Sequence, residues 1–131
     1  MKNTNKFERI VAATDVVCRG EEEDYARKIS SLASARQQAD KLSAIGASPG
    51  GAAMLLPEIW CARLSKTFAE IARLDGEVAA QARQLRMARA RREKAEDRLR
   101  DERTKERIAK EAKNVENHLE IALQSRRIRL R

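Results

Sequence analysis

Hydrophobic residues recur every seven positions through the first third of the chain, with polar residues between them. This repeat is typical of helices that pair along a narrow seam. It predicts a helix over about residues 6–45, with a soft point or kink at Gly20, where Gly costs about 1 kcal/mol relative to Ala inside a helix. The repeating positions are Val11, Cys18, Tyr25, Leu32 and Ala39, and Ile29, Ala35 and Leu42 fill intermediate positions of the same stripe.

The helical pattern stops at residues 46–53, where Gly46 precedes the sequence Ser48-Pro49-Gly50-Gly51. Proline lacks a backbone N–H and glycine tolerates a positive φ, so this composition predicts a turn. Pro57 then suits the first turn of a new helix, where its missing N–H is no loss. A second helix is therefore expected to begin at residue 57.

The seven-residue repeat returns after Pro57 and predicts a helix over about residues 57–128. Its repeating positions are Leu64, Ile71, Val78, Leu85 and Leu99, with Arg92 at the one intervening position and Phe68, Leu74, Ala88 and Ala95 as flanking residues. Beyond Leu99 the seam thins, and mainly alanines continue it: Ala109, Ala112, Val115, Leu119 and Ala122.

These elements predict an all-α fold in which two long helices form an antiparallel coiled-coil hairpin, as a single domain over residues 1–131. The composition agrees, because aromatic residues make up 3% and charged residues 37% of the chain, which leaves little with which to fill a wide core. The second helix is longer than the first, so its second half would need charge pairs, a dimer partner or another protein to stabilise it. A monomeric hairpin and a dimer satisfy the same seam.

The net charge of +8 is concentrated toward the C-terminus: residues 83–123 and residues 124–131 each carry an excess of four positive charges. Such a field can attract nucleic acid, an anionic membrane or an acidic protein groove. We find no signal peptide and no apolar run approaching the roughly 20 residues of a membrane span. The expected location is the cytoplasm, without insertion into a membrane.

Few residues suggest metal or catalytic chemistry. Cys18 and Cys61 form no CxxC pair and His118 is the single histidine, so no metal site or other cofactor is expected. The favoured interpretation of the cysteines is two reduced packing residues, and a disulfide between two helices is the alternative. We find no phosphate-binding glycine loop, and a helical hairpin offers no concave pocket, so the protein is predicted not to be an enzyme.

Two segments stand out as candidate binding surfaces. The end of the chain carries Arg126, Arg127, Arg129 and Arg131 without an acidic residue, which is typical of a docking tip. Near the turn, the apolar cluster that includes Met54, Leu55 and Trp60 predicts either a cap, with Trp60 folded over the end of the first helix near Leu42 and Ile45, or a partner-binding tip. The cap is the favoured interpretation.

Both helices have compositions that resemble a known family. A basic chain of this size, with Glu21-Glu22-Glu23-Asp24-Tyr25-Ala26-Arg27 in the first helix and Arg91-Arg92-Glu93-Lys94-Ala95-Glu96 in the second, resembles the FliJ and YscO-like central stalk proteins of type III secretion. The chain departs from that pattern in two respects: its turn falls at about one third of its length, and Gly20 interrupts the first helix.

The resemblance implies a stalk whose paired terminal ends enter the pore of a hexameric export ATPase, at the periphery of the inner-membrane export apparatus. It also implies contacts with an export gate protein and with secretion chaperones. Carried to this chain, the insertion surface is Phe7 to Val17 alongside Leu119 to Arg131. The candidate pore-binding residues are Phe7, Ile10, Val11, Leu119, Leu123, Arg126, Arg127, Arg129 and Arg131.

Two other functions are compatible with the sequence. One is a nucleic-acid-binding coiled coil that uses the basic face between Arg83 and Lys113, although interleaved acids and the absence of aromatic residues there weigh against it. The other is a structural adaptor or secretion chaperone that binds a partner helix along the alanine-rich seam.

Overall fold

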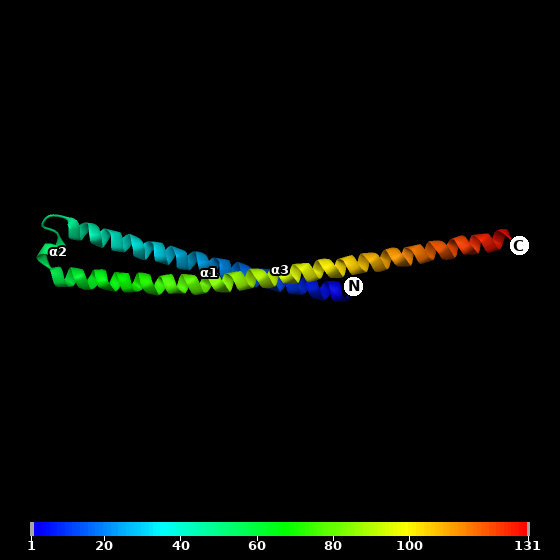
Figure 1. Cartoon of the computed structure of the whole chain (residues 1–131), viewed down its shortest axis with the longest axis horizontal. Helices are drawn as coiled ribbons and strands as arrows, with labels where there is room; N and C mark the ends of the chain where they lie inside the picture. Colours follow the sequence, from blue (N-terminus) through cyan, green and yellow to red (C-terminus); the bar gives the residue numbers. More distant parts are fainter. Residues whose placement is uncertain (1, 131) are drawn as a thin grey trace. The chain divides into compact units, whose positions relative to one another are not determined.

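The computed structural model describes residues 2–130, and the side chains of all of these except residues 2, 52 and 53. Two long helices, α1 (Lys2–Ala47) and α3 (Pro57–Arg129), are joined by the short helix α2 (Ala52–Leu55), and no strand occurs over residues 2–130 (Figure 1). The helices pack antiparallel, because contacts move backward along α3 as they move forward along α1: Lys28 meets Gln81 and Arg36 meets Asp75. The predicted hairpin, with a longer second helix, is confirmed.

The chain packs as two compact units, which we describe separately. The hairpin unit is Val16–Ala90 and contains the turn. The terminal unit combines Met1–Asp15 with Arg91–Arg131.

The hairpin unit is held together by two hydrophobic clusters along the seam. In one, Cys18 is fully buried against Leu85 and Ala88, with Tyr25 packed at the edge. In the other, Leu32 and Ala35 of α1 bury Leu74 of α3, with Ile71 and Val78 alongside. The small residues of the seam allow the two helix backbones to approach closely, so few large side chains are needed to exclude water.

Two residues assigned to the seam from the sequence lie outside it. Ile29 is 41% exposed and Phe68 is 53% exposed, whereas Lys28 and Thr67 occupy the half-buried positions next to them. A heptad seam has alternating spacings of three and four residues, so position 28 follows 25 and position 67 follows 64 whatever the residue type. Register along the seam outweighs the hydrophobicity of a single side chain here.

The terminal unit continues the same type of seam with more polar contacts. Ala95 and Leu99 of α3 are buried, while Phe7 and Val11 of α1 are half-buried. Arg92, the charged residue in the predicted seam, lies 3.7 Å from a carboxylate oxygen of Asp15. Further along, Arg103 pairs with Glu8 at 3.3 Å, and the hydroxyl of Thr4 donates to Glu106. Pairing between the helices therefore reaches residue 106 of α3.

The turn is shorter than the predicted span of residues 46–53. Helix α1 continues to Ala47, and α2 occupies the end of that span. Gly50 has a φ of 72°, which L-residues rarely adopt, and the Gly51 amide donates to the Ser48 carbonyl at 3.0 Å. A Cβ built on Gly51 would lie 2.4 Å from the Ile45 carbonyl oxygen, so glycine is required there by close backbone approach.

Two Gly→Ala changes are expected to have opposite effects. Gly51→Ala should lower the free energy of unfolding by roughly 1–3 kcal/mol, because the new methyl would collide with the Ile45 carbonyl. Gly20→Ala should raise it by about 0.5–1 kcal/mol, because α1 is continuous through Gly20 and its added Cβ meets nothing within 4 Å. Urea denaturation followed by circular dichroism would measure both changes in the free energy of unfolding. If Gly51→Ala were as stable as the wild type or more stable, the assigned turn would be contradicted.

Candidate interaction surfaces

The surface hollows along the helix pair are open and shallow. One of about 400 Å³ lies beside Ser34, Glu70 and Arg73 in the hairpin unit. Over the part of the chain that the structure describes, no three His, Cys, Asp or Glu side chains gather closely enough to hold a metal ion. Both thiols are free: Cys18 is buried and Cys61 is exposed, so the packing interpretation is correct for Cys18 and wrong for Cys61.

Trp60 caps the end of α1, as the favoured sequence interpretation predicted. Its indole Nε1 donates to the Leu42 carbonyl oxygen at 2.9 Å, five residues before the end of α1, which ties the side chain to the last turns of that helix. The ring lies directly against Gly46, where a Cβ would overlap it. Glycine at position 46 therefore makes room for the indole, and the cap fixes the first turn of α3 to the last turn of α1.

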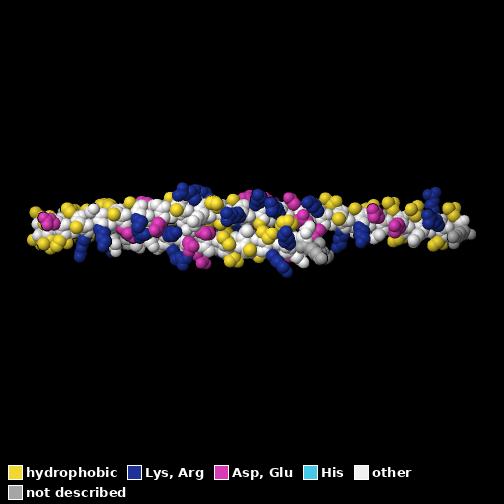
Figure 2. Space-filling view, turned by 90° about the horizontal axis from the view of Figure 1, so that it is seen from below, with side chains coloured by type: hydrophobic (Ala, Val, Ile, Leu, Met, Phe, Trp, Pro, Cys, Tyr) yellow, Lys and Arg dark blue, Asp and Glu magenta, His cyan; other side chains and the backbone are white. Residues whose placement is uncertain are grey.

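The other apolar residues near the turn face solvent. Met54 and Leu55 are 73% and 74% exposed, and Ile45, Leu56 and Ile59 are also exposed. Residues 42–62 carry one charge, Glu58, in a chain that is otherwise rich in charge. Figure 2 shows hydrophobic side chains gathered at the end of the hairpin unit that bears α2. We call residues 45–59 the apolar tip, and it contains two of the three predicted tip-binding residues in exposed positions.

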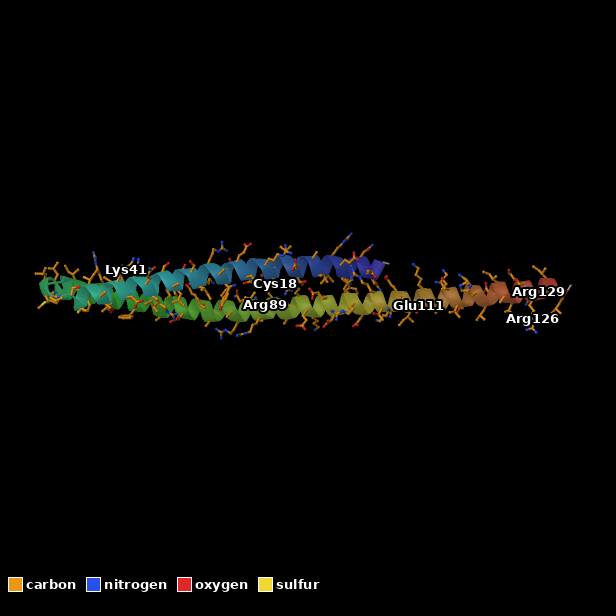
Figure 3. The ribbon with its side chains drawn as sticks, turned by 90° about the horizontal axis from the view of Figure 1, so that it is seen from above. Cys18, Lys41, Arg89, Glu111, Arg126 and Arg129 are labelled. Carbon is orange, nitrogen blue, oxygen red and sulfur yellow. The ribbon has the colours of Figure 1, made fainter. Side chains whose placement is uncertain are left out.

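In the terminal unit, α3 continues past the beginning of α1 (Figure 1). Every residue from 107 to 130 is exposed, and we call this segment the α3 extension. It presents large hydrophobic side chains to solvent, together with six basic and three acidic residues. Figure 3 shows Glu111, Arg126 and Arg129 on this helix, beyond the part of α3 that pairs with the α1 segment of the terminal unit. The extension is thus a second candidate binding surface.

The structure separates the predicted pore-binding residues into two groups. Phe7 and Ile10 line a hollow of about 270 Å³ with Arg91 and Arg98, and Val11 is half-buried in the same seam. The other group is exposed on the α3 extension and comprises Leu119, Leu123, Arg126, Arg127 and Arg129, while Arg131 lies outside the described residues.

The expectation that the N-terminal segment lies alongside Leu119 to Arg131 is therefore wrong. Glu8 of α1 contacts Arg103, and Asp15 contacts Arg92. The reason is length: with the turn at one third of the chain, α1 is too short to reach beyond residue 106 of α3 when both helices rise by about 1.5 Å per residue.

Gln81 is a buried polar residue that sequence analysis missed. It is 3% exposed, in the seam of the hairpin unit. Its side-chain oxygen accepts from the Lys28 ammonium at 3.1 Å, and its Nε2 donates to the Glu21 backbone oxygen at 3.3 Å and to the Glu21 carboxylate. The heptad spacing indicates a seam position here, because residue 81 lies seven residues after Leu74 and seven before Ala88. A satisfied polar residue in a seam specifies its register.

Replacing Gln81 by Leu is expected to raise the free energy of unfolding by about 1 kcal/mol. The variant should also be less specific in the register and number of helices that pair along the seam. Glu21 and Lys28 are half-buried and regain water, whereas a leucine would bury apolar surface in the seam. Urea denaturation would measure the stability, and sedimentation would detect additional oligomers. Gln84→Leu, at an exposed position of the same helix, is the matched control. A loss of stability in Gln81→Leu alone would show that the polar network itself stabilises the fold.

Two carboxyl groups, one exposed and one half-buried, have lowered pKa values. The Arg73 guanidinium donates to Glu70 and lowers the pKa of that carboxyl, and the Thr4 hydroxyl does the same for Glu106. A carboxyl whose folded pKa lies below its unfolded value stabilises the fold above the unfolded pKa, and this contribution is lost as the pH falls through the folded pKa. Both groups therefore favour the fold at neutral pH, one in each unit.

No family model, curated protein or solved structure matches this chain. Among the described residues, none of the helices has a stretch both long and apolar enough to cross a bilayer.

Proposed function

We propose that this protein is a non-catalytic central stalk of a type III secretion export apparatus, which binds within a hexameric export ATPase and promotes its assembly or activity. The α3 extension is the ATPase-binding surface in this proposal. The observation that carries it is a helical end, exposed on all sides, that combines Arg126, Arg127 and Arg129 with Ile128 and Leu130 and has no acidic residue after Glu120.

Charge and accessibility both support this assignment. A positively charged helix is steered electrostatically toward an acidic pore, and exposed aliphatic side chains between the arginines supply area to bury on arrival. The last turn of α3 has three arginines, which also complement the negative end of the helix dipole and so keep the end helical in isolation. The paired N-terminal segment then serves to hold α3 straight rather than to enter the ring.

The apolar tip is the surface for the other proposed contacts, those with the export gate protein and with secretion chaperones. Met54 and Leu55 are exposed hydrophobic anchors of the type found in partner interfaces. Trp60 is excluded from this role while it caps α1, because its indole N–H is already engaged.

The alternative of nucleic-acid binding by the face from Arg83 to Lys113 is weakened by its ion pairs. Arg89, Arg92 and Arg103 contact acidic residues of α1, while Arg100 and Lys105 contact acidic residues of α3. These acids reduce the net attraction for phosphates. Steeply salt-dependent binding to random duplex DNA would favour this alternative over the stalk.

The test is ATP hydrolysis by the cognate hexamer with and without the purified protein. The full chain should increase the rate several-fold, and neutralising the end with Arg126→Gln, Arg127→Gln and Arg129→Gln should remove most of the increase. A control with the same charge change, Arg83→Gln, Arg86→Gln and Arg91→Gln, should retain it. Failure of the full chain to bind the hexamer, or equal loss in both variants, would overturn the proposal.

A further inference from the structure

Contrary to the prediction from the sequence pattern, Ala112, Val115, Leu119 and Ala122 do not continue the α1-facing seam but belong to a hydrophobic stripe with a different phase on the α3 extension. Its members are spaced by four, three, four and three residues, as in a heptad seam: Ile108, Ala112, Val115, Leu119 and Ala122. The three large residues of this stripe are 57–60% exposed. Ile108 follows Glu106, which contacts α1, by two residues, or about 200° around the helix. The stripe therefore begins on the side of α3 away from α1.

The positions that would continue the α1-facing seam are mostly polar. They are Ala109, Lys113, Glu116 and Glu120. A longer α1-like partner on that side would gain little from burial, whereas a partner on the opposite side would cover every large residue of the stripe. The phase change thus indicates a different partner for the extension.

We propose that this partner is the stripe of a second copy of the chain, bound antiparallel. In the register that aligns the two stripes, Ile108 of each copy faces Leu119 of the second copy, and Ala112 faces Val115 of the second copy. Four hydrophobic layers result, over residues 108–119 of both helices. This small interface gives an expected dissociation constant on the order of 10–100 µM.

Opposite charges meet at both ends of the paired segment in this antiparallel register. The next layer outward pairs Lys105 of one copy with Ala122 of the second copy, and the layer beyond it pairs Asp101 with Arg126 of the second copy. The two-fold symmetry repeats both layers at the other end. Asp101 and Arg126 are exposed and lie on the same face of α3 as the stripe. Beside the hydrophobic layers, Glu111 faces His118 of the second copy, so no like charges meet along the edges.

Other arrangements place like charges together. A shift of one heptad in either direction sets Glu111 against Glu111 of the second copy, or Glu116 against Glu116 of the second copy. A parallel dimer would stack Asp101, Lys105 and Arg126 each against its own equivalent. Repulsion between like charges therefore selects the antiparallel register from among the alternatives.

This inference does not rest on the proposed ATPase, but the two are linked. Self-association covers the surface that the stalk proposal assigns to the ring, so the free dimer would have to dissociate before the extension could enter the hexamer. The dimer would then act as a concentration-dependent reserve of the free protein.

Sedimentation equilibrium of the full chain tests the proposal. The wild type should dimerise in the stated range, and Leu119→Ser should make it monomeric without loss of helix by circular dichroism. The matched control is Ile121→Ser, because Ile121 is also 60% exposed but lies about 200° around the helix from Leu119. A monomer at all concentrations up to about 1 mM, or equal weakening by both variants, would overturn the proposal.

Charge swaps and cross-links test the register. Asp101→Arg and Arg126→Asp should each weaken dimerisation about tenfold, and the double variant should restore it. Lys113→Asp, the same charge change as Arg126→Asp but off the stripe, should leave the dimer intact. In a Cys61→Ser background, a mixture of Ile108→Cys and Leu119→Cys chains should form a disulfide-linked heterodimer, and neither variant should cross-link alone. A double variant that stays weak, or self-linkage of Ile108→Cys, would rule out the antiparallel register.

Discussion

Replacing Leu85 by Ala is expected to lower the free energy of unfolding by about 2–4 kcal/mol. Leu85 is 4% exposed and packs against Cys18 and Ala88, at the end of the hairpin unit away from the turn. The change removes buried methyl groups and leaves a void that the small neighbours cannot fill. Urea denaturation followed by circular dichroism would measure the loss.

Met87→Ala is the matched control, because Met87 lies two residues along the same helix and is 55% exposed. Its cost should stay within about 0.5 kcal/mol. If both variants lost the same stability, the helices would not pair along the face that contains Leu85.

Replacing Trp60 by Ala is expected to cost about 2–3 kcal/mol, because the change removes both the aromatic packing on Gly46 and the hydrogen bond to the Leu42 carbonyl. Since Trp60 is the single tryptophan, the loss would be measured by circular dichroism rather than by fluorescence. The last turn of α1 would also fray, which amide hydrogen exchange at residues 42–47 would detect.

Trp60→Phe separates the two contributions. The phenyl ring retains most of the packing but has no N–H donor, so the cost should fall to about 1 kcal/mol. Met54→Ala, at an exposed residue of the apolar tip, should change stability little. A Trp60→Ala variant as stable as the wild type would show that the indole cap does not stabilise the turn.

Most of the fold could be predicted from the spacing of hydrophobic residues. Cys18, Leu32 and Leu85 follow the heptad and are buried as expected, and Pro57 begins α3. The errors came from following hydrophobicity instead of register. Ile29 and Phe68 are hydrophobic residues one position away from the seam, and a helix with many small seam residues leaves them on the surface.

The polar contacts of the seam were harder to predict. Gln81 and Arg92 both occupy heptad positions, but whether a polar residue is tolerated there depends on its partners in the other helix. Lys28 and Glu21 satisfy Gln81, and Asp15 pairs with Arg92. Those partners are fixed by the antiparallel alignment, which the sequence pattern of either helix alone does not determine.

The composition of the sequence identifies the candidate binding surfaces, but it does not determine which of their residues lie side by side. The exposed Met54 and Leu55 and the basic end of α3 were identified from the sequence. Phe7 to Val17 do not lie beside the C-terminus, because α1 is shorter than α3 and an antiparallel pairing from the turn brings its beginning only to residue 106. The same inequality leaves the α3 extension without an α1 segment beside it, and both proposals depend on that extension.

The antiparallel alignment of α1 and α3 is tested most directly by the distance between Arg36 and Asp75. Their side chains form an ion pair at 3.1 Å in the structure, although they are separated by 39 positions in sequence. Spin labels on Arg36→Cys and Asp75→Cys, in a Cys18→Ala and Cys61→Ser background, would measure it, with unlabelled protein added in excess to suppress contacts between chains. The fold predicts a separation on the order of 20 Å or less, set by two adjacent helices and the label arms. A distance near 60 Å, which a continuous helix over these residues would give at about 1.5 Å per residue, would contradict the hairpin.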